Sequence, residues 1–509
     1  MRLSDYNVSL SGMNAAQIAT MVAQQNISNI NTAGYVRQNV NQQALYGDGG
    51  LLQGKQTGYG VKVTDIARVT SGALNLQYNQ QIAKQSAAAY GSGALGQAMN
   101  LFGTLGTNTP SDYLDNFFTS WGALAKNPDQ QTNATALLSD MNLFEGQLNQ
   151  LKLGLDDLQH TISTDIRASV TGLNDLISKF GKLNQAIGNA GSNPPNDLLN
   201  ERDSLLAQMS AYAKVSTTTH PNNPEVYDIT IGGRLVVQGS KTNQIQMTAQ
   251  NGSYQFSVDG NQLDLPEGQL RAAVDVGGKE IKDYQTKLNT FMDGLVDGTN
   301  QAQLNSFNNQ IDQIAKINLQ LQADPANETL IKNRDEAVRQ LAKFPGVTVD
   351  STNGTLSYDG NTFTIAAIDT NAKASDISQF SIPIFSKNPD GSLQLNPILT
   401  KDNSSQGFLG AIADQMSALK NTPTIGNATL SDFMDGLITT VATDSSGANA
   451  IAKAENQTLD NLSNAKSSVE GVNIDEEMTN IMQYQSYYVA NTKAMNIVND
   501  MFQSLLNIM

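Results

Sequence analysis

The fold class of this chain of 509 residues is decided by its last stretch, GVNIDEEMTNIMQYQSYYVANTKAMNIVNDMFQSLLNIM (471–509). Mostly apolar residues recur there at alternating spacings of four and three, the pattern of a coiled-coil seam. The seam comprises Ile474, Met478, Ile481, Gln485, Tyr488, Thr492, Met495, Asn499, Phe502, Leu506 and Met509. Chain ends usually fray in water, whereas this end is apolar to its last residue. We therefore expect other subunits to bury it, with docking on its own domain as the alternative.

Polar residues interrupt the seam at Gln485, Thr492 and Asn499. Polar residues at seam positions cost stability but select the register and the partner. The pattern therefore favours partner-specific assembly over a marginal bundle within one chain.

The first residues of the chain carry a second narrow seam, formed by Leu3, Tyr6, Leu10 and Met13. An alanine-rich stretch follows, which lets a partner helix approach closely. The helix is predicted to stop at NINTAGY (29–35), with a left-handed turn between Asn31 and Gly34. Neither seam is wide enough to hold a helix alone, so we expect the two ends of the chain to pair.

The segments between the two ends alternate between helical and strand patterns. After a glycine-rich loop or hairpin (Gly47, Gly49, Gly50, Gly54, Gly58 and Gly60), GVKVTDIARV (60–69) predicts a strand. PSDYLDNFFTSWGALAKNP (110–128) predicts a helix capped by Ser111 or Asp112, with Trp121 in its core. The longest signal predicts a helix over 137–187, with one or two kinks or breaks at its glycines. Its seam comprises Leu137, Met141, Phe144, Leu148, Leu151, Leu155, Leu158, Ile162, Ile166, Val170, Leu173, Ile177, Phe180, Leu183 and Ile187.

A helix-plus-strand unit occurs twice. LISKFGKLNQAI (176–187) and NDLLNERDSLLAQMSAY (196–212) precede strands with hairpin turns at Gly232-Gly233 and Asp259-Gly260. IDQIAKINLQL (311–321) and ETLIKNRDEAVRQLAKF (328–344) repeat this order before a hairpin at Asp359-Gly360. The pair Arg202-Asp203 matches Arg334-Asp335, and we expect both to be structural ion pairs.

These signals predict an α+β multidomain protein. Long α-helical coiled-coil or bundle domains are formed by the paired N- and C-terminal regions, with β-rich modules inserted. We expect residues 1–45 with 468–509 to be the terminal coiled-coil assembly segments. The helical bundle domain is expected to comprise residues 46–215, 268–300 and 422–467. A β-rich outer module is expected over 216–267, and the second helix-plus-β module over 301–421.

Composition excludes several functions. The net charge is −16 without a basic block, so we expect no nucleic-acid partner. There is no cysteine and there are two histidines, which excludes thiol chemistry and disfavours a zinc site. No apolar run is long enough to span a membrane, and the first residues lack the apolar region of a cleaved signal peptide. Such a chain would be cytosolic, or exported by a route that needs no cleaved signal.

No catalytic motif is present, so we expect neither an enzyme nor a cofactor. The carboxylates at Asp156-Asp157 do not converge on one point of a helix surface. For Asp475-Glu476-Glu477 we expect a solvated first turn favoured by the helix dipole.

NISNINTAGY (26–35) resembles the asparagine-rich signature of the axial proteins of the bacterial flagellum. The stretch 471–509 is similar to the C-terminal segment of the hook-associated protein 1 family. GYGVKVTDIARV (58–69), LDNFFTSWGALAKNP (114–128), NDLLNERDSLL (196–206) and LSDFMDGL (430–437) follow that family's order, whereas 301–421 departs from it. The residues expected to carry assembly are Leu3, Tyr6, Leu10, Met13, Asn26, Asn29, Asn31, Gly34 and Tyr35, with Gly471, Val472, Asn473, Ile474, Asp475, Glu476, Glu477, Met478, Ile481, Tyr488, Met495, Phe502 and Leu506.

The resemblance implies a structural protein at the junction of hook and filament, assembling as a ring through its terminal helices. Its partners would be further copies of itself, the hook protein, the next junction protein and an export chaperone. The protein would be extracellular, exported by the flagellar type III apparatus without a cleaved signal peptide. The alternatives are a flagellar hook or distal-rod protein and, in another class, a secreted adhesin or hydrolase.

Overall fold

The structure is a computed structural model that describes residues 3–45, 58–103, 109–250, 253–401 and 405–506. The glycine-rich segment from Gly47 to Gly54 lies outside the described residues. The chain forms two compact units, each assembled from separate segments. Unit 1 comprises Met1–Tyr90, Asp165–Val274 and Asn449–Met509, and unit 2 comprises Gly91–Thr164 and Asp275–Ala448.

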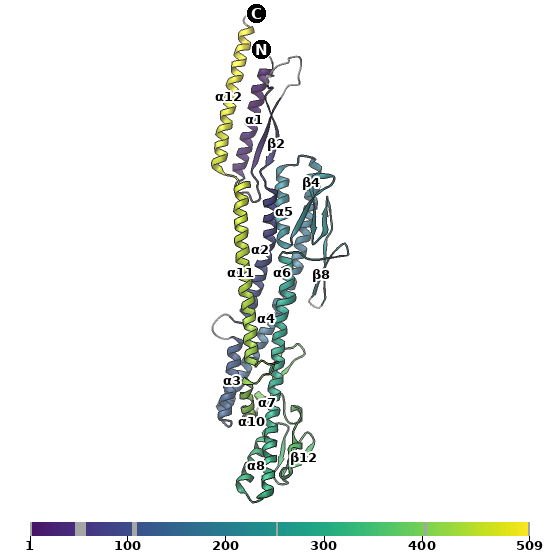
Figure 1. Cartoon of the computed structure of the whole chain (residues 1–509), viewed down its shortest axis with the longest axis vertical. Coiled ribbons are helices and arrows are strands. Elements are labelled where there is room, and N and C mark those ends of the chain that lie inside the picture. The colour runs from purple at the N-terminus through teal and green to yellow at the C-terminus, as the bar shows by residue number, and fades with distance from the viewer. Residues whose placement is uncertain (1–2, 46–57, 104–108, 251–252, 402–404, 507–509) are drawn as a thin grey trace. The chain divides into compact units, whose positions relative to one another are not determined.

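The two ends of the chain meet in unit 1. Helix α1 (Leu3–Ser28) lies antiparallel along helix α12 (Ile474–Leu506), as Figure 1 shows. Strands β1 (Gln38–Ala44) and β2 (Val61–Arg68) form an antiparallel hairpin that also packs on α1. The predicted pairing of the termini and the predicted strand over 60–69 are therefore confirmed.

The first β-rich region lies in unit 1 beside helix α5 (Asn196–Tyr212). One antiparallel sheet has the order β3-β4-β5-β6 and another the order β7-β8-β9. These strands are β3 (Val215–His220), β4 (Asn223–Ile231), β5 (Arg234–Gln238), β6 (Lys241–Thr242), β7 (Ile245–Gln250), β8 (Ser253–Val258) and β9 (Asn261–Leu263). Gly232-Gly233 and Asp259-Gly260 all have positive φ, as two-residue hairpin turns require.

Unit 2 is organised around two aromatic clusters. Phe117 of α3 (Pro110–Lys126) contacts Trp121 and Phe144, and Phe144 contacts Phe291. Phe307 stacks on Phe380, with ring centroids 4.1 Å apart. Besides short 3-10 turns, this unit contains α7 (Ile281–Ala323), α8 (Glu328–Leu341), β10 (Thr348–Asp350), β11 (Thr355–Tyr358), β12 (Asn361–Thr364), β13 (Phe385–Lys387), β14 (Leu393–Leu395), α9 (Ile398–Lys401) and α10 (Ser405–Ala418).

Several helices contribute residues to both units. They are α2 (Gly72–Leu101), α4 (Gln131–Ala190) and α11 (Leu430–Glu470). Helix α6 (Gln269–Asp275) is followed by a π-helical turn (Val276–Glu280) that leads into α7. Helix α7 is continuous through residue 301, where the second module was expected to begin.

The predicted seam of the long helix is confirmed, because every one of its members from Leu137 to Ile187 is buried. The predicted breaks are wrong, since α4 is one helix from Gln131 to Ala190. Three of its glycines, Gly154, Gly172 and Gly181, lie so close to neighbours that an added side chain would force a shift, and at Gly181 a Cβ atom would lie 2.4 Å from the Thr242 side chain. A Cβ atom at Gly154 would lie 2.6 Å from Leu101, and one at Gly172 would lie 2.9 Å from the Tyr212 hydroxyl oxygen. Close packing at these positions offsets the low helix propensity of glycine.

The predicted cap of α3 is also corrected. Thr109, not Ser111 or Asp112, is the N-cap residue, and Pro110 occupies the first helical position. The Thr109 hydroxyl accepts from the Asp112 amide at 3.3 Å, and the Asp112 carboxylate accepts from the Thr109 amide at 2.8 Å. Asp112 therefore completes a capping box rather than beginning the helix.

The sequence repeat has matching contacts in the two units. In unit 1, the Asn184 side chain donates to the carbonyls of Tyr227 and Gly239, both at 2.7 Å. In unit 2, Asn318 donates to the carbonyls of Ile365 (2.8 Å) and Ile368 (3.0 Å). The two asparagines end the matching tripeptides KLN (182–184) and KIN (316–318). Each copy thus ties its long helix to the strand module that follows.

Candidate assembly site

The terminal helices pack closely because α1 presents small residues to its neighbours. Ala15, Ala16, Ala19 and Ala23 are all buried. A Cβ atom at Gly12 would lie 2.7 Å from the side-chain oxygen of Asn491 on α12. The close approach predicted from the alanine-rich stretch is therefore confirmed.

The predicted seams are only partly used in this pairing. The exposed members of the predicted seams are Tyr6, Leu10, Ile474, Met478, Tyr488 and Phe502. The half-buried members are Met13, Ile481 and Met495. The side chains of Leu3 and Leu506, and all of Met509, lie outside the described residues. Half-buried positions such as Tyr484, Asn491 and Val498 show that the covered face of α12 is shifted from the predicted seam. The shift leaves large apolar side chains facing outward.

The asparagine-rich signature holds the end of α1 to the start of β1. Asn26 is 1% exposed, and its side chain donates to the Gln38 carbonyl at 2.9 Å. Its oxygen accepts from the Tyr35 hydroxyl at 2.9 Å and from the Gln38 amide at 3.0 Å. Between these contacts the chain reverses at Gly34, whose φ of 77° matches the predicted left-handed turn.

The other two asparagines of the signature have different surroundings. Asn29 accepts from the Thr32 hydroxyl at 3.1 Å and donates to the Gln25 carbonyl at 3.0 Å, which stabilises the turn locally. Asn31 is exposed. Of the three, Asn26 is therefore the one that joins two elements.

The break between α11 and α12 is built by Gly471 and Asn473. A Cβ atom at Gly471 would lie 2.3 Å from the Ser467 carbonyl oxygen, so a side chain does not fit there. The Asn473 side chain accepts from the Asp475 amide at 3.0 Å, which caps the start of α12. Val472 between them is half-buried.

The acidic turn that follows is not simply solvated, as had been expected. Asp475 is exposed, but Glu476 forms an ion pair with Arg37 at 2.7 Å, and Glu477 is only 4% exposed. Glu477 lies near Tyr35, because the start of α12 packs beside the turn after α1. Burial, followed by the charges of Asp197 and Glu477, raises the pKa of the Tyr35 phenol to about 12.

Glu470, the last residue of α11, is a functional candidate that the sequence analysis missed. It is 3% exposed and accepts from the Ser71 amide at 3.1 Å and the Asn75 side chain at 2.8 Å. The Lys466 ammonium group forms an ion pair with the Glu470 carboxylate at 3.1 Å. The backbone carbonyl of Glu470 accepts from the Arg37 amide at 2.9 Å. The sequence offered one indication of its role: Glu470 directly precedes Gly471, the first of the C-terminal residues expected to carry assembly.

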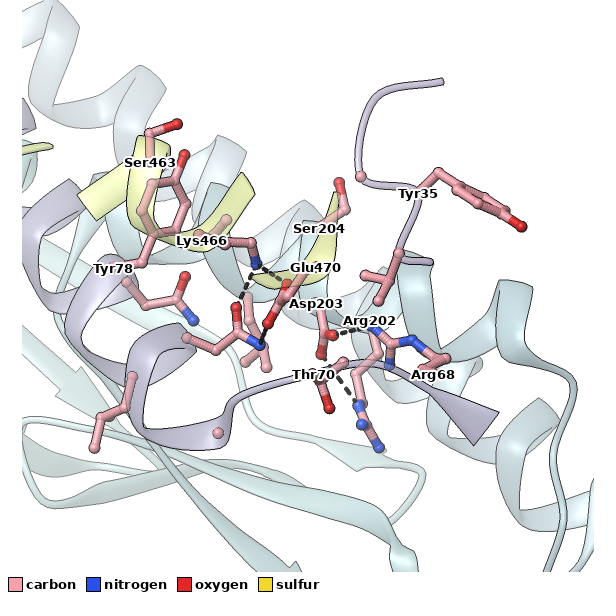
Figure 2. Close-up of a pocket in the computed structure, with 18 of the residues that line it drawn as sticks. Tyr35, Arg68, Thr70, Tyr78, Arg202, Asp203, Ser204, Ser463, Lys466 and Glu470 are labelled. Atoms are coloured by element: carbon pink, nitrogen blue, oxygen red, sulfur yellow. Dashed lines mark hydrogen bonds and ion pairs between the residues drawn. The ribbon is translucent and has the colours of Figure 1, made fainter. Parts of the chain in front are cut away.

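A cavity opens beside this turn, between the terminal segments and α5 (Figure 2). Arg68 and Arg202 both pair with Asp203 in its wall. Arg202 also donates to the Glu225 carbonyl at 2.9 Å and lies 4.0 Å from the ring centre of Tyr227. These contacts agree with the expected structural ion pair.

In the described part of the chain, no group of histidine and acidic side chains could hold a metal ion. His220 contacts the Asp228 carboxylate at 2.9 Å across β3 and β4, a partner that the sequence analysis did not find. Among the helices that the structure describes, none combines the length and hydropathy needed to cross a bilayer.

Comparison with known proteins finds flagellar axial proteins. The family described as "Flagellar hook-associated protein FlgK helical domain" matches residues 95–307, and "Flagellar basal body rod FlgEFG protein C-terminal" matches 467–508. Flagellar hook-associated protein 1 of Escherichia coli is 25% identical and that of Salmonella typhimurium 24% identical, each alignment covering 99% of both chains. Along its full length the chain resembles flagellar hook-associated protein 1.

A solved structure has a related fold. The flagellar hook junction protein FlgK of Burkholderia pseudomallei is 15% identical, with a TM-score of 0.52. The match covers 78% of this chain and 100% of that structure. The likeness supports the α+β architecture with long helices that the sequence predicted.

Proposed function

We propose that this protein is a structural subunit of the bacterial flagellum that joins the hook to the filament. Its relatives along the full length are hook-associated proteins. The single structural observation behind the proposal is the paired termini, because α12 packs on α1 through one face and exposes large apolar side chains on another. The hook or distal-rod alternative is less well supported, since the match over 95–307 is to the hook-associated helical domain.

Assembly through the terminal helices rests on the apolar side chains that α12 leaves exposed. Ile474 is 44% exposed, and over the whole set the exposed fractions lie between 40% at Tyr488 and 59% at Met482 and Ile497. The other members are Met478, Tyr487, Tyr488, Val489, Met501 and Phe502. Burying one such side chain fully contributes about 1.5–3 kcal/mol, so neighbouring subunits that covered these side chains would be held strongly. Tyr6, Leu10 and Met21 of α1 extend the exposed apolar surface.

The partners follow from this surface. Further copies of the chain, arranged as a ring or short tier, would cover α12 from the side, with the hook protein and the next junction protein at the two edges of the ring. Before assembly the same surface would need shielding, and we propose that an export chaperone covers it during passage through the flagellar apparatus. The assembled protein would lie outside the cell.

The test replaces outward apolar residues of α12 by aspartate. Met482→Asp combined with Ile497→Asp should abolish filament attachment in cells that make only this variant, because a charge in an apolar interface is costly. Asn496→Asp is the matched control, since it adds a carboxylate at an exposed polar position of the same helix. The readout is the fraction of hooks that carry filaments in electron micrographs, together with the circular dichroism of the purified chains. Normal filaments on the double variant would contradict assembly through α12.

The location is tested separately by immunogold labelling with an antibody against residues 216–420. A single band where hook meets filament is expected. Label along the whole hook would favour the hook-protein reading, and label below it the rod reading.

A further inference from the structure

The cavity beside the terminal turn carries more positive than negative charge. Its volume is about 490 Å³, a size typical of ligand pockets. The charged residues in its wall are Arg68, Arg202 and Lys466 against Asp203 and Glu470. This excess is notable in a chain with 47 acidic and 31 basic residues.

The excess lies on the two arginines. Lys466 and Glu470 compensate each other at 3.1 Å. Asp203 alone serves both Arg68 and Arg202, as the ion pairs in Figure 2 show. One carboxylate therefore faces two guanidinium groups, and one positive charge remains without a counter-charge in the wall.

Both arginines are deeply buried and keep hydrogen-bonding capacity. Their side chains are 7% and 8% exposed. The Nε atom of each is buried and donates no hydrogen bond to the protein, although that of Arg202 lies 3.7 Å from Asp203. Two buried guanidinium groups that share one carboxylate are incompletely compensated. Incomplete compensation of buried charge is costly, so this arrangement fits a site that an anion completes.

We propose that the cavity binds a carboxylate group between Arg68 and Arg202. Arginine matches the planar carboxylate through parallel donors. The charge balance favours a monoanion, because a phosphate monoester carries about −1.5 to −2 at neutral pH and would exceed the single uncompensated charge. Apolar and aromatic residues in the wall, such as Leu76 and Tyr78, suit the body to which the carboxylate is attached.

The carboxylate can come from a small free acid or from an acidic side chain of a second copy of the chain. Gly34 and Gly471 also line the cavity, so it adjoins the residues expected to carry assembly. The inference concerns the charge and chemistry of the cavity and holds wherever the protein is located.

The experiment measures thermal stability and calorimetric binding of the full chain with acetate, with acetamide as the neutral analogue of the same shape. Acetate should raise the melting temperature and acetamide should not, because only a ligand that binds the folded state stabilises it. Arg68→Gln should weaken acetate binding by about tenfold or more, the cost of losing a charged hydrogen bond. Arg167→Gln, the same change at an exposed position of α4, should leave binding unchanged.

Asp203→Asn provides a test in the opposite direction. Removing the internal carboxylate leaves both arginines uncompensated, so acetate should bind several-fold more tightly and restore stability lost by the substitution. If the cluster were only a structural ion pair, Asp203→Asn would lower stability without any dependence on acetate.

Self-association distinguishes the two sources. If a second copy supplies the carboxylate, Arg68→Gln weakens association in sedimentation experiments and acetate competes with it in the wild type. If the ligand is a free acid, acetate binds without changing association. Absence of acetate binding together with unchanged association of Arg68→Gln would overturn the proposal.

Discussion

At the scale of single residues, the terminal junction depends on a few buried polar groups. Asn26 satisfies three hydrogen-bonding groups at once, which explains why an asparagine is needed at the end of α1. Glu470 joins α11 to α2 and to the segment before β1 through its side chain and its carbonyl. Removing either side chain would leave its buried partners without a hydrogen bond, and each such unsatisfied group costs about 1–3 kcal/mol.

Tyr35 makes the stability of this junction dependent on alkaline pH. Its pKa rises from 10.0 to about 12 in the folded chain, so between these values the folded state binds more protons than the unfolded state. The stabilisation is therefore complete below pH 10 and is lost as the pH rises through about 12. We expect the free energy of unfolding of Tyr35→Phe to fall less steeply with pH over this range, measured by denaturant titration at each pH.

Tyr59→Phe, at an exposed tyrosine, is the control for Tyr35→Phe. At neutral pH Tyr35→Phe should still be less stable by about 1 kcal/mol, since it loses the hydrogen bond to Asn26. If the free energy of unfolding fell equally steeply with pH in Tyr35→Phe and in the wild type, Tyr35 would not be the cause of the loss of stability at alkaline pH.

At the scale of elements, the separation of α11 from α12 depends on one glycine. Gly471→Ala would bring a methyl group against the Ser467 carbonyl oxygen, so the last turn of α11 must shift and the Glu470 contacts with it. We expect a loss of about 1–3 kcal/mol and faster proteolysis between residues 466 and 478.

Gly447→Ala is the matched control on α11, because a Cβ atom there meets nothing within 4 Å. It should be neutral or stabilising by up to about 1 kcal/mol, since alanine favours helix. If the two substitutions changed the free energy of unfolding equally, close packing at Gly471 would not be the cause of the loss.

At the scale of the whole molecule, two units carry one copy of the repeat each. Asn184 and Asn318 tie the two strand modules to their helices by the same pair of contacts. Asn184→Leu should increase amide hydrogen exchange in 215–250 only, and Asn318→Leu in 348–368 only, measured by mass spectrometry. The effects of the double variant should add, because the sites share no partner. Exchange that increases in both modules after one substitution would contradict independent units.

The sequence by itself determined the helices, the hairpin turns, the repeat and the pairing of the chain ends. These features follow from local patterns in the sequence. Apolar residues recur at helical spacing along α4, Asp259-Gly260 has the residue types of a two-residue hairpin turn, and both termini carry narrow apolar seams. The class of protein was also predictable, because NISNINTAGY and the last segment are family signatures.

Only the tertiary structure decided which face of each terminal helix is covered and which charges are buried. A helical seam indicates one apolar side, but the partner's small residues set the rotation, and on α12 this left Ile474 and Met478 exposed. Glu470 and Glu477 are polar in sequence, and their burial depends on residues hundreds of positions away. The same holds for Arg68, Arg202 and Asp203, whose charges meet because β2 folds against α5, a long-range contact that no local pattern encodes.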